Sequence, residues 1–101
     1  MVLEIIWSPE AIATFSSTLS YLRTEWSEKE VTQFKARVNQ KLALLTLQPR
    51  IGKPSKKGSL IFRTVLHKRI TLVYHYQPLQ KQIELITFWN NWQDPKRSKH
   101  L

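Results

Sequence analysis

The second half of this chain is rich in basic side chains that can bind a polyanion. Residues 31–83 contain eleven Lys and Arg residues and no Asp or Glu, and the whole 101-residue chain carries a formal charge of +9. Such segregation favours binding to nucleic acid or to an acidic protein, with a merely solvated surface as the alternative. Arg63 is one candidate, because a guanidinium can hold a phosphate through two parallel hydrogen bonds. The candidate contacts are Lys53, Lys56, Lys57, Arg63, Lys68 and Arg69.

Two tryptophans near the end of the chain, Trp89 and Trp92, are further candidates. An indole ring can stack on a nucleic-acid base, which is worth about 1–3 kcal/mol per base. The alternative is packing between the last strand and the first helix.

Other chemistry has little support in the sequence. His67 and His75 have no carboxylate beside them, and the chain has no cysteine, so we expect no metal site and no cofactor. Ser55 and Ser59 have no visible general base, which leaves nucleophilic hydrolysis without support.

Length and composition predict one globular domain. The chain is 42% hydrophobic and 23% charged, close to the average for globular proteins. Glu4 interrupts the apolar N-terminal run, and the segment Leu42–Leu47 is far too short to span a bilayer. We therefore expect a soluble, cytoplasmic protein.

The elements that must position these residues follow from apolar spacing and capping residues. Ser8, followed by Pro9, can cap one helix, and Ser27 with Glu30 forms a capping box for a second. Apolar residues then recur at intervals of three and four. The expected elements are a strand at Val2–Trp7, helices at Ser8–Trp26 and Ser27–Leu47, and strands at Leu60–Leu66, Ile70–Tyr76 and Lys81–Trp89.

This order predicts an α+β fold, β-α-α-β-β-β. The short connections favour an antiparallel sheet, with a two-helix hairpin covering one face. Gln48–Ser59 reads as a loop because Pro and Gly cluster there. We expect residues 1–95 to form the domain and residues 96–101 to form a mobile basic tail.

Several short segments along the chain are informative in combination, although none of them is specific alone. They are Trp7-Ser8-Pro9-Glu10-Ala11, Tyr21-Leu22 with Trp26, Phe34, Leu42 and Leu45, Pro49-Arg50-Ile51-Gly52-Lys53-Pro54, Arg63 with Val65, Leu72-Val73-Tyr74, and Ile83-Glu84-Leu85-Ile86. In this order and spacing, the sequence resembles the RelE/ParE superfamily of type II toxin–antitoxin toxins over about Leu3–Pro95.

The resemblance implies a growth-inhibiting protein that a cognate antitoxin wraps and neutralises. Two activities occur on this fold. RelE-like members enter the ribosome and cleave mRNA without a metal, whereas ParE-like members act on DNA gyrase. The fold alone does not choose between them.

For the nuclease activity, the resemblance assigns the phosphate-binding and catalytic role to Arg63, with Lys53, Lys56 and Lys57 beside it. Nuclease members also place a basic residue and an aromatic or histidine at or after the last strand. Here no tyrosine follows Tyr76, and Thr71 stands where such members often have an arginine. A nuclease would therefore need a substitute acid, for which the candidates are Tyr74, Tyr76 and His67.

These departures, together with the long helical hairpin, favour ParE-like, non-nucleolytic action. The alternatives are a RelE-like nuclease and an inactive or repurposed binding module. If the chain is such a toxin, Trp89 and Trp92 can form part of a groove in which the antitoxin binds. Lys68 and Arg69, in the turn between two strands, remain candidates for polyanion contact.

Overall fold

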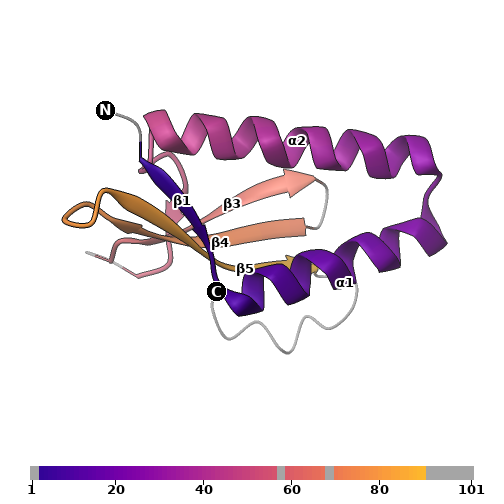
Figure 1. Ribbon diagram of the computed structural model, residues 1–101, viewed down its shortest axis with the longest axis horizontal. Coiled ribbons are helices and arrows are strands. Elements are labelled where there is room, and N and C mark those ends of the chain that lie inside the picture. Colours follow the sequence, from indigo (N-terminus) through magenta and orange to yellow (C-terminus); the bar gives the residue numbers. More distant parts are fainter. Residues whose placement is uncertain (1–2, 57–58, 68–69, 91–101) are drawn as a thin grey trace.

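A computed structural model describes residues 3–56, 59–67 and 70–90 of the chain. Two helices pack against a five-stranded sheet (Figure 1). The elements in chain order are β1 (Glu4–Trp7), α1 (Pro9–Glu25), α2 (Glu28–Leu47), β2 (Lys53–Pro54), β3 (Ile61–His67), β4 (Ile70–Gln77) and β5 (Gln82–Asn90).

Both helices begin where the sequence predicts. Ser8 Oγ accepts a hydrogen bond of 3.0 Å from the backbone N–H of Ala11, and Ser27 Oγ accepts one of 3.3 Å from that of Glu30. Each bond satisfies a donor that the first turn of a helix leaves without a partner. These local signals therefore set the two helix starts correctly.

The sheet order is β1-β5-β4-β3-β2. The meander β3–β4–β5 is antiparallel, as predicted, and the α+β class and element order are confirmed. The sheet as a whole is mixed rather than antiparallel, because β1 pairs parallel to β5. The two-residue strand β2, inside the segment expected to be a loop, pairs with β3.

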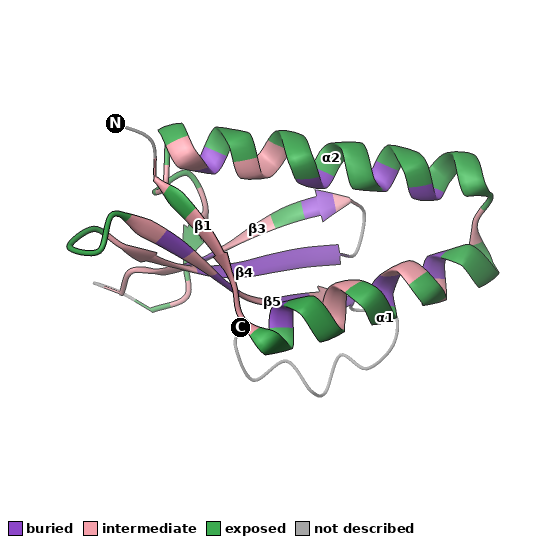
Figure 2. Ribbon diagram, viewed as in Figure 1, coloured by how far each residue is buried: buried purple, intermediate pink, exposed green. Residues whose placement is uncertain are grey.

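The core lies between the helices and one face of the sheet. α1 packs mainly along β5 and α2 along β3, so the hairpin is spread across the sheet. In Figure 2 the buried positions of the helices recur along their length, between positions that are exposed or intermediate. Phe34 of α2 and Leu72 and Tyr74 of β4 are among the fully buried side chains.

Two side chains of the first helical segment cover the edge of β5 beyond β1. Ser8 Oγ donates to the carbonyl oxygen of Ile86 over 3.1 Å, and the backbone N–H of Phe88 donates to Thr14 Oγ1 over 2.9 Å. Ile86 is skipped in the pairing of β4 with β5, which makes it a bulge. The Thr14 hydroxyl thus accepts from a backbone N–H of β5 that a neighbouring strand would otherwise bind.

Candidate functional site

The sheet face opposite the helices carries a row of polar side chains. Residues on a strand alternate between faces, and Phe62, Leu72 and Tyr74 belong to the core under the helices. Arg63 and His75 therefore lie on the other face. On that face Lys53 lies opposite Arg63, and His75 lies opposite Glu84. We call these four residues the polar row.

Register places Arg63 and His75 as diagonal neighbours, since Arg63 is opposite Val73 and His75 is opposite Ile61. Diagonal neighbours lie about 7–8 Å apart, within reach of a long side chain. Arg63 and His75 are both half-buried, whereas Lys53 is exposed. The row can therefore present two cations and an imidazole to one anionic ligand.

A strand arginine can also pair with a carboxylate such as Glu84, which would give Arg63 a structural role. Arg63 is on β3 and Glu84 is on β5, with β4 between them. Within the described part of the chain the ion pair is Arg23–Glu28, at 3.7 Å and exposed on both sides. Arg63 therefore keeps its guanidinium available to a ligand.

A neighbouring amide orients His75. Gln77 Nε2 lies 3.2 Å from His75 Nδ1, and Gln82 Nε2 donates to Gln77 Oε1. An amide nitrogen donates, so His75 Nδ1 is the acceptor in this contact. Sequence reasoning treated His75 as an isolated strand histidine. The signal it missed was register, which brings Glu84 and Arg63 beside it.

A buried tyrosine holds the loop that leads to Lys53. The Tyr74 hydroxyl donates to the carbonyl oxygen of Pro49 over 2.8 Å and accepts from the backbone N–H of Gly52 over 3.1 Å. Burial raises the pKa of this phenol, and the bond from Gly52 offsets part of that rise. The phenol stays protonated at neutral pH and acts as a structural clamp.

None of the three substitute acids lies beside Arg63. Tyr74 is fully buried and its hydroxyl is bonded inside the protein. Tyr76 packs against the core, and the Arg50 guanidinium lies 5.4 Å from its ring centre. The His67 ring packs edge-on against Trp26, 4.8 Å between centres, at the far end of β3.

The remaining candidates have separate places. Lys56 is exposed in the loop after β2. Trp89 is half-buried and lies opposite Thr71 on the face away from α1, while Phe88 takes the core side. The alternative of packing against the first helix is therefore wrong for Trp89. The other candidates, Lys57, Lys68, Arg69 and Trp92, lie outside the described residues, as does the 96–101 tail.

Within residues 3–56, 59–67 and 70–90, no group of three or more His, Asp and Glu side chains is arranged to hold a metal ion. In the same ranges no helix has the length and apolar character needed to cross a membrane.

A comparison with protein families identifies the family of this chain. Residues 5–95 match the family described as the ParE toxin of the type II toxin–antitoxin system parDE. The match extends from β1 past the end of β5 and includes the polar row. The search of curated proteins finds no match.

Proposed function

Because this chain belongs to the ParE toxin family of type II toxin–antitoxin systems, we propose that it arrests growth by acting on DNA gyrase without cutting RNA. A cognate antitoxin, bound partly through the basic residues of positions 31–83, would neutralise it. Both partners are macromolecules, and the proposal needs no small-molecule cofactor. The proposal implies a cytoplasmic protein, because gyrase and its DNA are found in the cytoplasm.

The observation that carries this proposal is the burial of Tyr74. Metal-free RNA cleavage needs a group that protonates the leaving 5′-oxygen. The Tyr74 hydroxyl is committed to Pro49 and Gly52, and its raised pKa reflects burial rather than a position beside a substrate. Tyr76 and His67 also lie away from Arg63, which supports a non-nucleolytic role for the basic surface.

A second candidate function rests on His75. This imidazole is a diagonal neighbour of Arg63 and lies opposite Glu84. An arginine to bind phosphate and a histidine to transfer a proton are two parts of a RelE-like nuclease. A binding module without either activity is the third reading.

Brief induction in bacteria separates these functions. Cells would be sampled within minutes of induction, and mRNA 5′ ends mapped across the genome. We expect arrested growth with unchanged mRNA ends. New ends in codon register would favour the nuclease, and uninterrupted growth would favour the binding module.

A purified assay then tests the target. The chain is added to gyrase and relaxed plasmid, and supercoiling and gyrase-linked DNA breaks are measured. Relaxation by a type I topoisomerase is the control, since a general DNA-binding effect would inhibit both enzymes. Loss of supercoiling with intact relaxation is expected, and equal inhibition would contradict a gyrase-directed action.

A further inference from the structure

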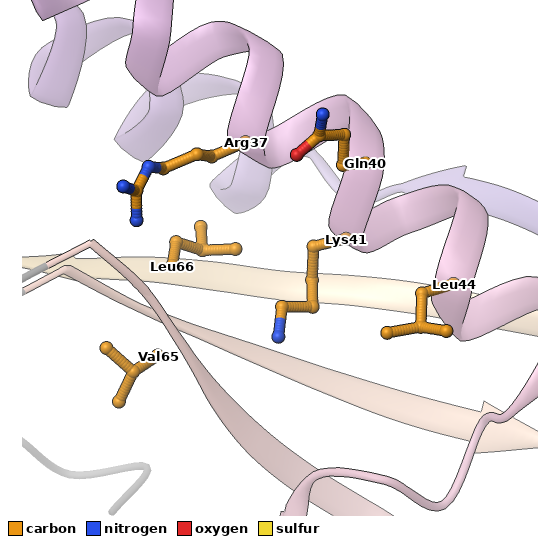
Figure 3. A pocket seen from close by; sticks show the side chains of 6 residues that line it. All are labelled: Arg37, Gln40, Lys41, Leu44, Val65 and Leu66. Carbon is orange, nitrogen blue, oxygen red and sulfur yellow. The ribbon is translucent and has the colours of Figure 1, made fainter.

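The turn between β4 and β5 carries the most exposed of the large apolar side chains among the described residues. Leu79 is 92% exposed, whereas the other five such side chains at the surface range from 37% to 73%. Two of those five, Leu44 and Val65, line the cavity between α2 and β3 (Figure 3). Leu79 buries almost no area within the protein, so its apolar side chain is available to another molecule.

Hydrogen bonds close the base of this turn. The backbone N–H of Lys81 donates to the carbonyl oxygen of Pro78 over 3.1 Å. Just below it, Gln82 Nε2 donates to Gln77 Oε1, across the last residue pair of β4 and β5. The two strands are therefore tied together immediately before the chain turns.

The turn also projects from the sheet. β1 pairs with β5 only as far as Glu4, opposite Gln82, and β3 pairs with β4 only as far as Ile61, opposite His75. Figure 1 shows the turn reaching past both neighbouring strands at one end of the molecule. Glu4 is the acidic residue closest to the turn in this register. Residues 78–81 thus form a tip, and Leu79 lies on it.

Lys81 occupies a backbone conformation that favours glycine. Its φ angle is 55°, in the left-handed region, where any residue with a side chain is strained. A glycine would form the same turn without that strain. What the exposed lysine side chain adds is a positive charge at the base of the tip.

Two more cations border the tip. The Arg50 guanidinium lies 5.4 Å from the ring centre of Tyr76, near the end of β4. The backbone N–H of Tyr76 donates to the carbonyl oxygen of Leu60, which follows the loop that carries the exposed Lys56. Residues 31–83, which include the tip and these cations, contain no Asp or Glu. The surroundings of Leu79 therefore favour an anionic ligand.

The composition of the tip favours DNA over a protein ligand. Leu is under-represented among the residues that dominate protein–protein binding, and Lys is depleted from such interfaces. Proteins that bind the minor groove of DNA insert apolar side chains such as Leu or Pro between base pairs, and they contact the groove with Arg, Lys and Gln. The tip has this composition, since Pro78 and Leu79 are followed by Gln80 and Lys81.

We propose that the β4–β5 turn binds double-stranded DNA in its minor groove, where Leu79 wedges between two base pairs while Lys81 and Arg50 contact phosphates. Such a wedge unstacks the two base pairs and bends the duplex. This interaction goes beyond the proposed function and stands whether or not gyrase is the target, because it concerns DNA alone.

The test uses the full chain and a duplex of about twenty base pairs with 2-aminopurine at a central T–A step, a step that deforms easily. 2-Aminopurine fluoresces more strongly when it is unstacked, so the native chain should raise the fluorescence about twofold or more. Because Leu79 is exposed, Leu79→Ala should leave the fold intact and abolish this rise, while binding measured by anisotropy weakens less than about fivefold.

Ile12→Ala is the matched control, since Ile12 is an exposed apolar residue of α1. This variant should raise the fluorescence like the native chain. No rise with the native chain at saturating concentration would overturn the proposal. An equal rise with Leu79→Ala would overturn it as well.

Lys81→Gly tests the phosphate contact while the turn is kept, because glycine adopts the positive φ angle freely. Loss of one phosphate contact should weaken DNA binding several-fold at low salt and reduce the slope of log K against log salt by about 1. Lys35→Ala removes the same charge from an exposed position of α2 and should change neither quantity. Equal losses would show a general attraction between a basic protein and DNA, which would overturn the proposal.

Gyrase free of DNA provides the last comparison. A complex with gyrase that Leu79→Ala abolishes, together with unchanged 2-aminopurine fluorescence, would make the tip a protein contact and overturn the proposal. Growth arrest by the native chain is a separate readout of the proposed function. Arrest without a DNA wedge would reject the wedge alone, and a DNA wedge without arrest would reject the proposed toxin activity alone.

Discussion

The phenol of Tyr74 accepts a hydrogen bond of 3.1 Å from the backbone N–H of Gly52, although 22 positions separate these residues in the sequence. The same hydroxyl donates to the carbonyl oxygen of Pro49. A side chain of the central strand thus holds the turn that leads into β2. The place of Lys53 opposite Arg63 therefore depends on a residue that lies on the other face of the sheet.

Replacement of this phenol should loosen the turn. Tyr74→Phe leaves the ring in the core but removes the partner of Pro49 and Gly52, and we expect a loss of about 1–3 kcal/mol in the free energy of unfolding. Urea denaturation measures the loss, and amide exchange at Gly52 should accelerate. Tyr76→Phe is the matched control. An equal effect of the two substitutions would show that the clamp contributes nothing.

Tyr74 also predicts a loss of stability at alkaline pH. Burial raises its pKa above the ordinary value of 10.0, so above that pH the unfolded chain releases a proton that the folded chain retains. The free energy of unfolding then falls as pH rises toward the folded pKa, whereas this contribution is fully present below 10.0. The stability difference between the native chain and Tyr74→Phe should therefore stay constant up to about pH 9 and shrink above about pH 10. A constant difference would mean that the phenol titrates alike in both states.

Gly52 has no room for a side chain. A Cβ at this position would lie 2.7 Å from the Tyr74 hydroxyl and 2.9 Å from the carbonyl oxygen of Arg63. Because the second atom belongs to a paired strand, Gly52→Ala should cost about 1–3 kcal/mol. The double variant with Tyr74→Phe should lose less than the two single losses combined, since one clash disappears. Strict additivity in urea denaturation would contradict this geometry.

The elements that the sequence predicted correctly are those with local signals. Ser8 and Ser27 act on N–H groups three residues away, and the apolar spacing of each helix is set within its own turns. The parallel pairing of β1 with β5 joins residues almost eighty positions apart, and no turn residue marks it. The same limit applies to the site. Arg63 was identified by its residue type and by the family resemblance. Its neighbour His75 depends on register, and the face of Trp89 depends on the bulge at Ile86.

The two helix caps should differ in strength. Within the described residues Ser27 Oγ makes only the cap bond, whereas Ser8 Oγ also donates to the carbonyl oxygen of Ile86 in β5. Ser27→Ala should lower the free energy of unfolding by about 1 kcal/mol, and Ser8→Ala by about 2 kcal/mol because a long-range bond is lost as well. Thermal unfolding compares the two. A larger loss for Ser27→Ala would mean that the Ile86 bond adds no stability.

Arg63 provides the most direct test of the polar row. Its side chain is half-buried on the face away from the core, so Arg63→Ala should change the free energy of unfolding by less than about 1 kcal/mol. If it binds an anionic group of the target, the loss of a charged hydrogen bond, about 1.5–3 kcal/mol, should raise the protein level needed for growth arrest about tenfold or more. Induction at graded levels, with the protein quantified in each culture, measures this. Lys35→Ala removes the same charge from the outer side of α2 and should arrest growth like the native chain. A folded Arg63→Ala variant that arrests growth at the native level would assign Arg63 a structural role only.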